Sequence, residues 1–221
     1  MPADKTYDLR PYFDLMYQKS ALSLSIKPAP ADELRSAQRE LRERLSEALG
    51  LCVYGPRDTA PKVERVSYEL CNGYVREKLS LEIAPGLVVP LYLLRPISKN
   101  LRLNADIRTP VALALNGHGR GVCEILGIPD ACGRPEGRDY QKLFAVELVK
   151  RGITVAAPEI IGFGESRLHG YMDKNGNGGD CSPISGMSLL WGGCTAGLRV
   201  FQVMRVIDYL ETLPEVFADR L

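Results

Sequence analysis

Two glycine-containing loops hold most of the residues that could do chemistry. Residues 116–121 read Asn-Gly-His-Gly-Arg-Gly, and residues 162–166 read Gly-Phe-Gly-Glu-Ser. Each loop follows an apolar run, at 111–115 and 153–157, that is typical of a strand buried on both faces. Glycine lets backbone N–H groups point into a cleft at the carboxyl end of a strand. The two loops therefore indicate a cleft at the ends of two buried strands.

Nucleotide, metal and disulfide chemistry fit these residues less well. The glycines at 117, 119 and 121 lack the G-x-G-x-x-G spacing, and no Gly-Lys-Ser/Thr occurs. Residues 173–178 match the first half of a calcium loop, but Ile184 stands where a bidentate glutamate is needed. The six cysteines show no C-x-x-C pair and are expected to be reduced thiols. We predict no metal and no cofactor.

Composition excludes several classes of protein. With 221 residues, 45% of them hydrophobic and 25% charged, the chain can form one domain with a substantial core. A net charge of +1 with no basic cluster argues against nucleic-acid binding. There is no run of about 18 uncharged apolar residues and no secretion signal at the start of the sequence, so we predict a cytoplasmic protein that does not enter a membrane.

The pattern of elements changes along the chain. Helical spacing of Leu34, Leu41 and Leu45 predicts a helix over 32–49, with Asp32 available as its N-cap. We then expect an antiparallel meander from strands at 63–70, 74–83 and 87–94, and a surface connection over 97–109. We divide the chain into a helical extension, 1–60, and an α/β domain, 61–221.

The second half of the chain alternates strands with helices. A helix predicted at 139–150 lies between the two buried strands, which is typical of a parallel crossover in an α/β sheet. A last helix is predicted at 196–213. Its apolar stripe contains Val200, Val203 and Met204 with Ile207 and Leu210, whereas the polar residues Arg199, Gln202 and Arg205 lie largely on the other side.

Residues 63–221 resemble the first half of an α/β-hydrolase, particularly the acetyl xylan esterase and cephalosporin C deacetylase-like branch. The resemblance is carried by the meander, the His118-Gly119 turn, the loop at 162–166 and the sequence Val-Ile-Asp-Tyr-Leu at 206–210. It implies an oxyanion hole whose first backbone N–H donor is supplied by Gly119 and Arg120, with a second from the residue after the nucleophile. It also implies the chain order nucleophile, acid, histidine, so neither His118 nor His169 is expected to be the base.

Four residues are candidates for the pocket. His118 is expected to orient the turn in which it lies, and Glu165 and Ser166 to serve as turn or pocket groups, because no G-x-S-x-G surrounds Ser166. Trp191, the only tryptophan, could line an acyl or sugar pocket, although a packing role is equally expected.

Cys194 offers an alternative nucleophile. Residues 192–196 read Gly-Gly-Cys-Thr-Ala and would form a nucleophile elbow if 188–191 were a strand. A catalytic thiol of this kind needs a histidine later in the sequence, and none follows His169. We therefore favour a glycine-rich helix start.

By this resemblance, the last residues of the sequence lead into the strand that precedes the nucleophile. No catalytic residue is therefore expected within the sequence. We interpret the chain as a segment of a serine carboxylesterase that acts on short acyl esters such as acetylated sugars. The segment is expected to be inactive alone and to have a small-molecule ester as its partner. We expect the isolated chain to self-associate or to be completed by a second chain. The alternative is a non-catalytic partial α/β domain that binds a ligand or a partner protein.

Overall fold

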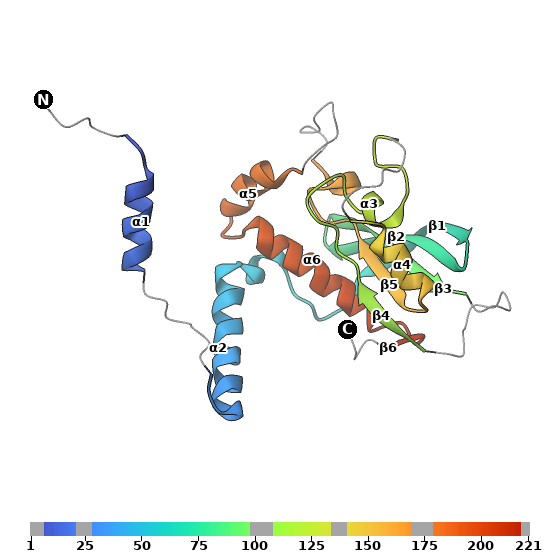
Figure 1. The fold of residues 1–221 in the computed structure, drawn as a ribbon, viewed down its shortest axis with the longest axis horizontal. Helices are drawn as coiled ribbons and strands as arrows, with labels where there is room; N and C mark the ends of the chain where they lie inside the picture. The colour runs from blue at the N-terminus through green and yellow to red at the C-terminus, as the bar shows by residue number, and fades with distance from the viewer. Residues whose placement is uncertain (1–6, 21–27, 98–107, 134–140, 169–178, 218–221) are drawn as a thin grey trace, which may run out of the picture. The chain divides into compact units, whose positions relative to one another are not determined.

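A computed structural model of the chain describes residues 7–20, 28–97, 108–133, 141–168 and 179–217. The chain divides into two compact units, Met1–Leu45 and Ser46–Leu221. The first unit holds helix α1 and most of α2, and the second holds the sheet with its covering helices (Figure 1). Residues 173–178, which match half of a calcium loop, His169 and most of the connection at 97–109 lie outside the described residues.

The first unit is helical. It contains α1 (Arg10–Lys19) and most of α2 (Ala31–Ala48), which confirms the helix predicted at 32–49. Asp32 lies in the first turn of α2, not at its N-cap, and there an acidic side chain still stabilises the helix dipole. Neither helix contains a buried residue. Among the described residues, no helix combines the length and apolar character needed to cross a membrane.

The second unit is built on a mixed sheet with strand order β1-β2-β3-β5-β4-β6. Strands β1 (Lys62–Cys71), β2 (Tyr74–Ala84) and β3 (Leu87–Pro96) form the antiparallel meander that the sequence predicts. The turns between them contain Gly73 and Gly86, both with positive φ, a conformation that glycine adopts without steric cost.

The parallel part of the sheet follows. Strands β4 (Thr109–Leu113) and β5 (Thr154–Pro158) pair in parallel, as the two apolar runs predict. Helices α3 (Cys123–Leu126) and α4 (Phe144–Lys150) lie in the connection between them; the helix predicted from residue 139 begins at 144, and 134–140 are not described. Strand β6 (Val216–Phe217) pairs in parallel with the first two residues of β4.

The two parallel strands differ in burial. All five residues of β5 are buried, as predicted. In β4 only Val111 is buried, and Leu115, just beyond its end, is 42% exposed. The prediction of a strand covered on both faces is therefore wrong for β4. The physical reason is that, in the described part of the sheet, β6 pairs only with Thr109 and Pro110 and leaves the rest of that edge without a neighbouring strand.

Apolar cores lie on both faces of the sheet. Helix α6 (Thr195–Leu210) packs on one face through Phe201, Val206 and Leu210, and α3 and α4 pack on the other (Figure 1). Three further short elements complete the unit: the 3-10 turns η1 (Leu51–Tyr54) and η2 (Gly164–Ser166), and helix α5 (Cys181–Leu189).

The buried face of α6 is not the stripe expected from its apolar residues. Gln202 and Arg205 are buried, whereas Val200 is exposed. Gln202 accepts a hydrogen bond from Ile161 N and donates one to Glu159 O, at 3.0 and 2.7 Å. These polar side chains are buried because they satisfy backbone groups of neighbouring segments.

Candidate active site

The loops after β4 and β5 meet at one edge of the sheet, because the two strands are parallel. The His118 ring packs edge-on against the Phe163 ring, with the centroids 5.3 Å apart. The Arg199 guanidinium lies 4.7 Å from the Phe163 centroid, and Arg199 Nε donates to Ile161 O at 2.9 Å. Both glycine-containing loops and α6 thus contact one another at the predicted place.

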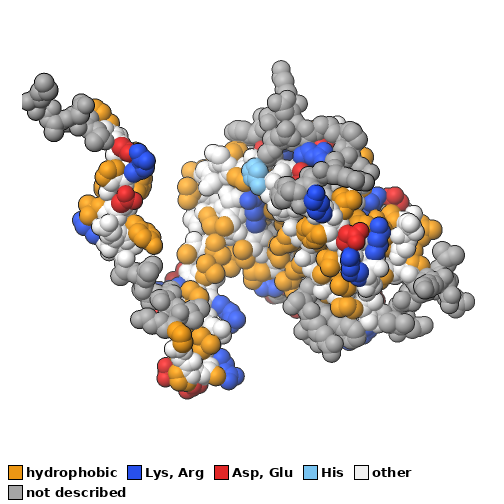
Figure 2. All heavy atoms as spheres, viewed as in Figure 1, with side chains coloured by type: hydrophobic (Ala, Val, Ile, Leu, Met, Phe, Trp, Pro, Cys, Tyr) orange, Lys and Arg blue, Asp and Glu red, His pale blue; other side chains and the backbone are white. Residues whose placement is uncertain are grey.

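A strand-end cavity of about 460 Å³ lies between these segments. Its wall comes from residues 115–118 of the first loop, from Ile160 and Phe163 of the second, and from α6. Three of its α6 residues belong to the predicted apolar stripe, whereas Arg199 was expected on the other side of the helix; Figure 2 shows hydrophobic side chains gathered over this helix. The α6 lining residues are Arg199, Val200, Val203 and Met204.

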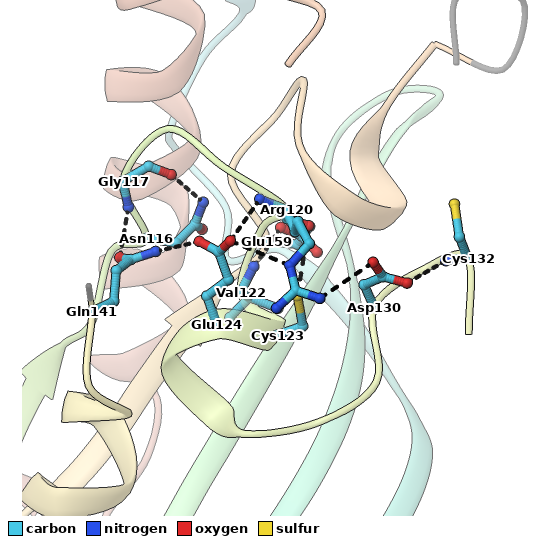
Figure 3. A network of polar contacts seen from close by, with 10 residues as sticks. All are labelled: Asn116, Gly117, Arg120, Val122, Cys123, Glu124, Asp130, Cys132, Gln141 and Glu159. Atoms are coloured by element: carbon cyan, nitrogen blue, oxygen red, sulfur yellow. Dashed lines mark hydrogen bonds and ion pairs between the residues drawn. The ribbon is translucent and has the colours of Figure 1, made fainter. Parts of the chain in front are cut away.

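A buried polar network holds the first loop from behind (Figure 3). Gly117 N donates to Gln141 Oε1 at 2.9 Å, and Gln141 Nε2 donates to Glu124 Oε2 at 2.7 Å. Arg120 N donates to Glu124 Oε1 at 3.1 Å, and the Arg120 guanidinium contacts the carboxylates of Glu124 and Asp130. The backbone of the loop is therefore fixed by side chains that sequence patterns do not single out.

The two candidate oxyanion donors differ in availability. The Arg120 N–H is used by Glu124, as described, whereas the Gly119 N–H has no hydrogen-bond partner among the described residues. A Cβ at Gly119 would lie 2.5 Å from Glu124 Oε2, so a larger side chain there would push this carboxylate away. Of the two amides, that of Gly119 is the one able to bind a new acceptor.

The four pocket candidates do not line the same cavity. His118 lines the strand-end cavity, whereas Glu165, Ser166 and Trp191 line a second, side cavity of about 310 Å³. The side cavity is mostly apolar, with walls from β3, α5 and the loop after β5. Residues 160–168 separate the two cavities, since Ile160 and Phe163 face the first and Ile161 the second.

Within the side cavity the three candidates have different surroundings. Glu165 accepts a hydrogen bond from the Tyr92 hydroxyl at 2.8 Å and pairs with Lys78. Burial together with the Glu165 charge raises the pKa of Tyr92, which therefore stays protonated. Ser166 Oγ is buried without a partner among the described residues, and Trp191 is 53% exposed.

Cys194 does not stand on a nucleophile elbow. Residues 188 and 189 belong to helix α5, so the strand that such an elbow requires is absent there. The Cys194 thiol caps α6 by accepting from Gly197 N at 3.2 Å, and it contacts Leu49 O at 3.6 Å. Tyr54 OH bonds to both the N–H and the carbonyl of Cys194. The glycine-rich helix start is the interpretation that the structure supports.

The sequence interpretation missed Glu159. This side chain directly follows β5 and is only 2% exposed. Burial raises its pKa from 4.5 to about 7, although hydrogen bonds from Val122 N and Glu165 N act in the opposite direction. A charged residue between a largely apolar strand and a glycine-containing loop is a signal that could have identified it. Among the described residues, no group of three or more potential ligands could hold a metal ion.

No protein-family model and no curated protein matches the sequence. The chain is similar to a crystal structure from Bacteroides fragilis provisionally described as an acetyl xylan esterase, with a TM-score of 0.80 and 20% identity over 98% of this chain and 53% of that chain. Acetyl xylan esterase 1 from a Thermoanaerobacterium species matches with a TM-score of 0.49 and 17% identity, over 88% of this chain and 50% of that chain. The chain spans about half the length of these structures, and its fold is a partial α/β-hydrolase sheet.

Proposed function

We propose that this chain is part of a serine carboxylesterase that acts on short acyl esters. In this proposal the Gly119 N–H supplies one donor of the oxyanion hole, and the serine nucleophile, acid and base come from residues outside the 221 of this sequence. The observation that carries the proposal is the Gly119 amide, which has no hydrogen-bond partner among the described residues and directly follows the cavity-lining residues 115–118 in the loop after β4. An N–H fixed in advance toward a developing oxyanion stabilises the transition state of acyl transfer.

The remaining residues have supporting roles in this proposal. Glu124 and Gln141 hold the loop so that the amide does not have to reorganise during the reaction. His118 packs against Phe163 and orients the turn; it is not the catalytic base. The apolar wall from α6 excludes water from the reacting ester.

Ester hydrolysis tests the proposal directly. The 221-residue chain alone is expected not to turn over p-nitrophenyl acetate, whereas a protein that also includes the coding sequence past Leu221 should turn it over and lose activity to a serine reagent. Turnover by the shorter chain, abolished by the same reagent, would show that the nucleophile lies within it. Inactivity of the longer protein would favour a ligand-binding domain without catalysis.

Two substitutions at one position test the donor. Gly119→Ala and Gly119→Pro both bring a Cβ against Glu124, but only Gly119→Pro removes the N–H. Loss of an oxyanion donor should lower kcat of the longer protein by about 10²- to 10³-fold relative to Gly119→Ala, with a smaller change in KM. Equal kcat values for the two variants would exclude Gly119 as the donor.

A further inference from the structure

We infer that Glu159 is a positioning residue that fixes the loop after β4 against the loop after β5. Only its consequence for catalysis rests on the proposed function; its structural role does not. Each carboxylate oxygen accepts a hydrogen bond from a different loop: Oε1 from Val122 N at 2.9 Å (Figure 3), and Oε2 from Glu165 N at 3.3 Å. One buried side chain thus joins the two segments that form the cavity wall.

The backbone of Glu159 is itself held on two sides. Its N–H donates to Pro90 O of β3 at 2.9 Å, and its carbonyl accepts from Gln202 Nε2 of α6 at 2.7 Å. Because Gln202 Oε1 also accepts from Ile161 N, the start of the second loop cannot shift without breaking contacts to α6. The carboxylate therefore projects from a fixed point of the sheet.

Two glycines make room for this carboxylate. A Cβ at Gly121 would overlap Glu159 Oε1, and a Cβ at Gly164 would overlap Glu159 Oε2. Both glycines have positive φ, of 108° and 44°, so a side chain would also strain the backbone at either position. One glycine comes from each loop, and both lie against the Glu159 carboxylate. Gly121 and Gly164, one from each glycine pattern of the sequence, therefore share one structural cause.

Several charged or titratable groups surround Glu159. They are Lys78 on β2, Tyr92 on β3, Cys123 on α3 and Glu165 on η2. Burial and the Glu165 charge raise the pKa of Glu159 to about 7, whereas Lys78 and the two backbone amides lower it. Near neutral pH the group therefore exchanges a proton, and an amide that donates to the ionised form should respond to that exchange.

Nuclear magnetic resonance of the ¹⁵N-labelled 221-residue chain tests this geometry without any activity. The amide proton resonances of Val122 and Glu165 should move together as pH rises, with one midpoint at about 7. Glu159→Gln should abolish the response at Val122. The matched Glu165→Gln variant should keep it with a lower midpoint, because it removes a like charge.

Specific outcomes would overturn the inference. In the unmodified chain, the resonance of Val122 or Glu165 would not change with pH, or the two resonances would change with different midpoints. In Glu159→Gln, the resonance of Val122 would still titrate. The measurement on the unmodified chain needs no variant, so misfolding of a variant does not prevent the test.

A second measurement concerns catalysis in the longer protein. Glu159→Gln should lower kcat by about tenfold or more, because the loops are then misplaced. In the wild type, kcat should change with pH at the same midpoint as the amide proton resonances, and this change should be missing in the variant. A longer protein without ester turnover would refute the proposed function and leave the amide titration as the test of Glu159. An active longer protein whose amides do not titrate would refute only the role of Glu159.

Discussion

The helices of the first unit and helix α6 of the second unit are both amphipathic, but they differ in what covers their apolar residues. Phe13 in α1 is 62% exposed, whereas Phe201 in α6 is 2% exposed and packs in the core of the sheet. No residue of α1 or α2 is buried. Helical spacing of apolar residues thus predicts that a helix forms, but it does not show whether the same chain buries the apolar side.

The largest expected effect comes from a matched pair of phenylalanine substitutions. Phe201→Ala should lower the free energy of unfolding by about 3–5 kcal/mol, because it opens a cavity in a packed core. Phe13→Ala should change it by less than about 0.5 kcal/mol. Urea denaturation of both variants gives the two values. A comparable loss in Phe13→Ala would mean that α1 is covered in solution, as it would be in a self-associated chain.

A pH dependence also distinguishes the two units, since, in the part of the chain that the structure describes, the buried carboxyl with a raised pKa lies in the second unit. The pKa of Glu159 is 4.5 in an exposed reference state and about 7 in the folded chain. The folded state therefore binds the proton more tightly, and stability from this group is complete below pH 4.5 and lost as pH rises through 7.

Each pH unit between the two pKa values lowers the free energy of unfolding by about 1.36 kcal/mol. Ionisation of Glu159 therefore lowers it by about 3 kcal/mol between pH 4.5 and 7. Chemical denaturation between pH 5 and 8 should show a smaller decline in Glu159→Gln than in the wild type. An identical decline in both proteins would mean that the carboxyl does not titrate in this window.

A pair of glycine substitutions separates close packing around Glu159 from helix propensity. Gly164→Ala should cost about 2 kcal/mol, because its Cβ would overlap Glu159 and its φ is positive. Gly186→Ala, in α5 with open space around it, should stabilise by about 0.5–1 kcal/mol. Thermal unfolding of the two variants measures the difference. Equal effects would contradict the close contact with Glu159.

The smallest effect is expected from removing the first unit. Deletion of residues 1–45 should change the free energy of unfolding of the second unit by less than about 1 kcal/mol, because the deleted helices hold no buried residue. Denaturation of the shortened chain provides the value. A larger loss would show that the two units stabilise each other.

Much of the fold could be predicted because its signals are local. The β-forming residues of the meander, the two apolar runs and the turns at Gly73 and Gly86 each depend on residues that are neighbours in sequence. The candidate site was predicted less completely. The sequence indicated the loops around Gly119 and Gly164, but not that the Arg120 amide is engaged by Glu124.

The amino-acid sequence by itself determined the meander, the two parallel strands, the helices α2 and α6 and the two loops at the strand ends, since side-chain pattern and glycine turns act over a few residues. Only the tertiary structure decided that Gln202 and Glu159 are buried, that Val200 faces a cavity, and that Trp191 and His118 line different cavities. The reason is that a buried polar group is tolerated only where distant backbone groups complete its hydrogen bonds, and such partners are brought together by folding.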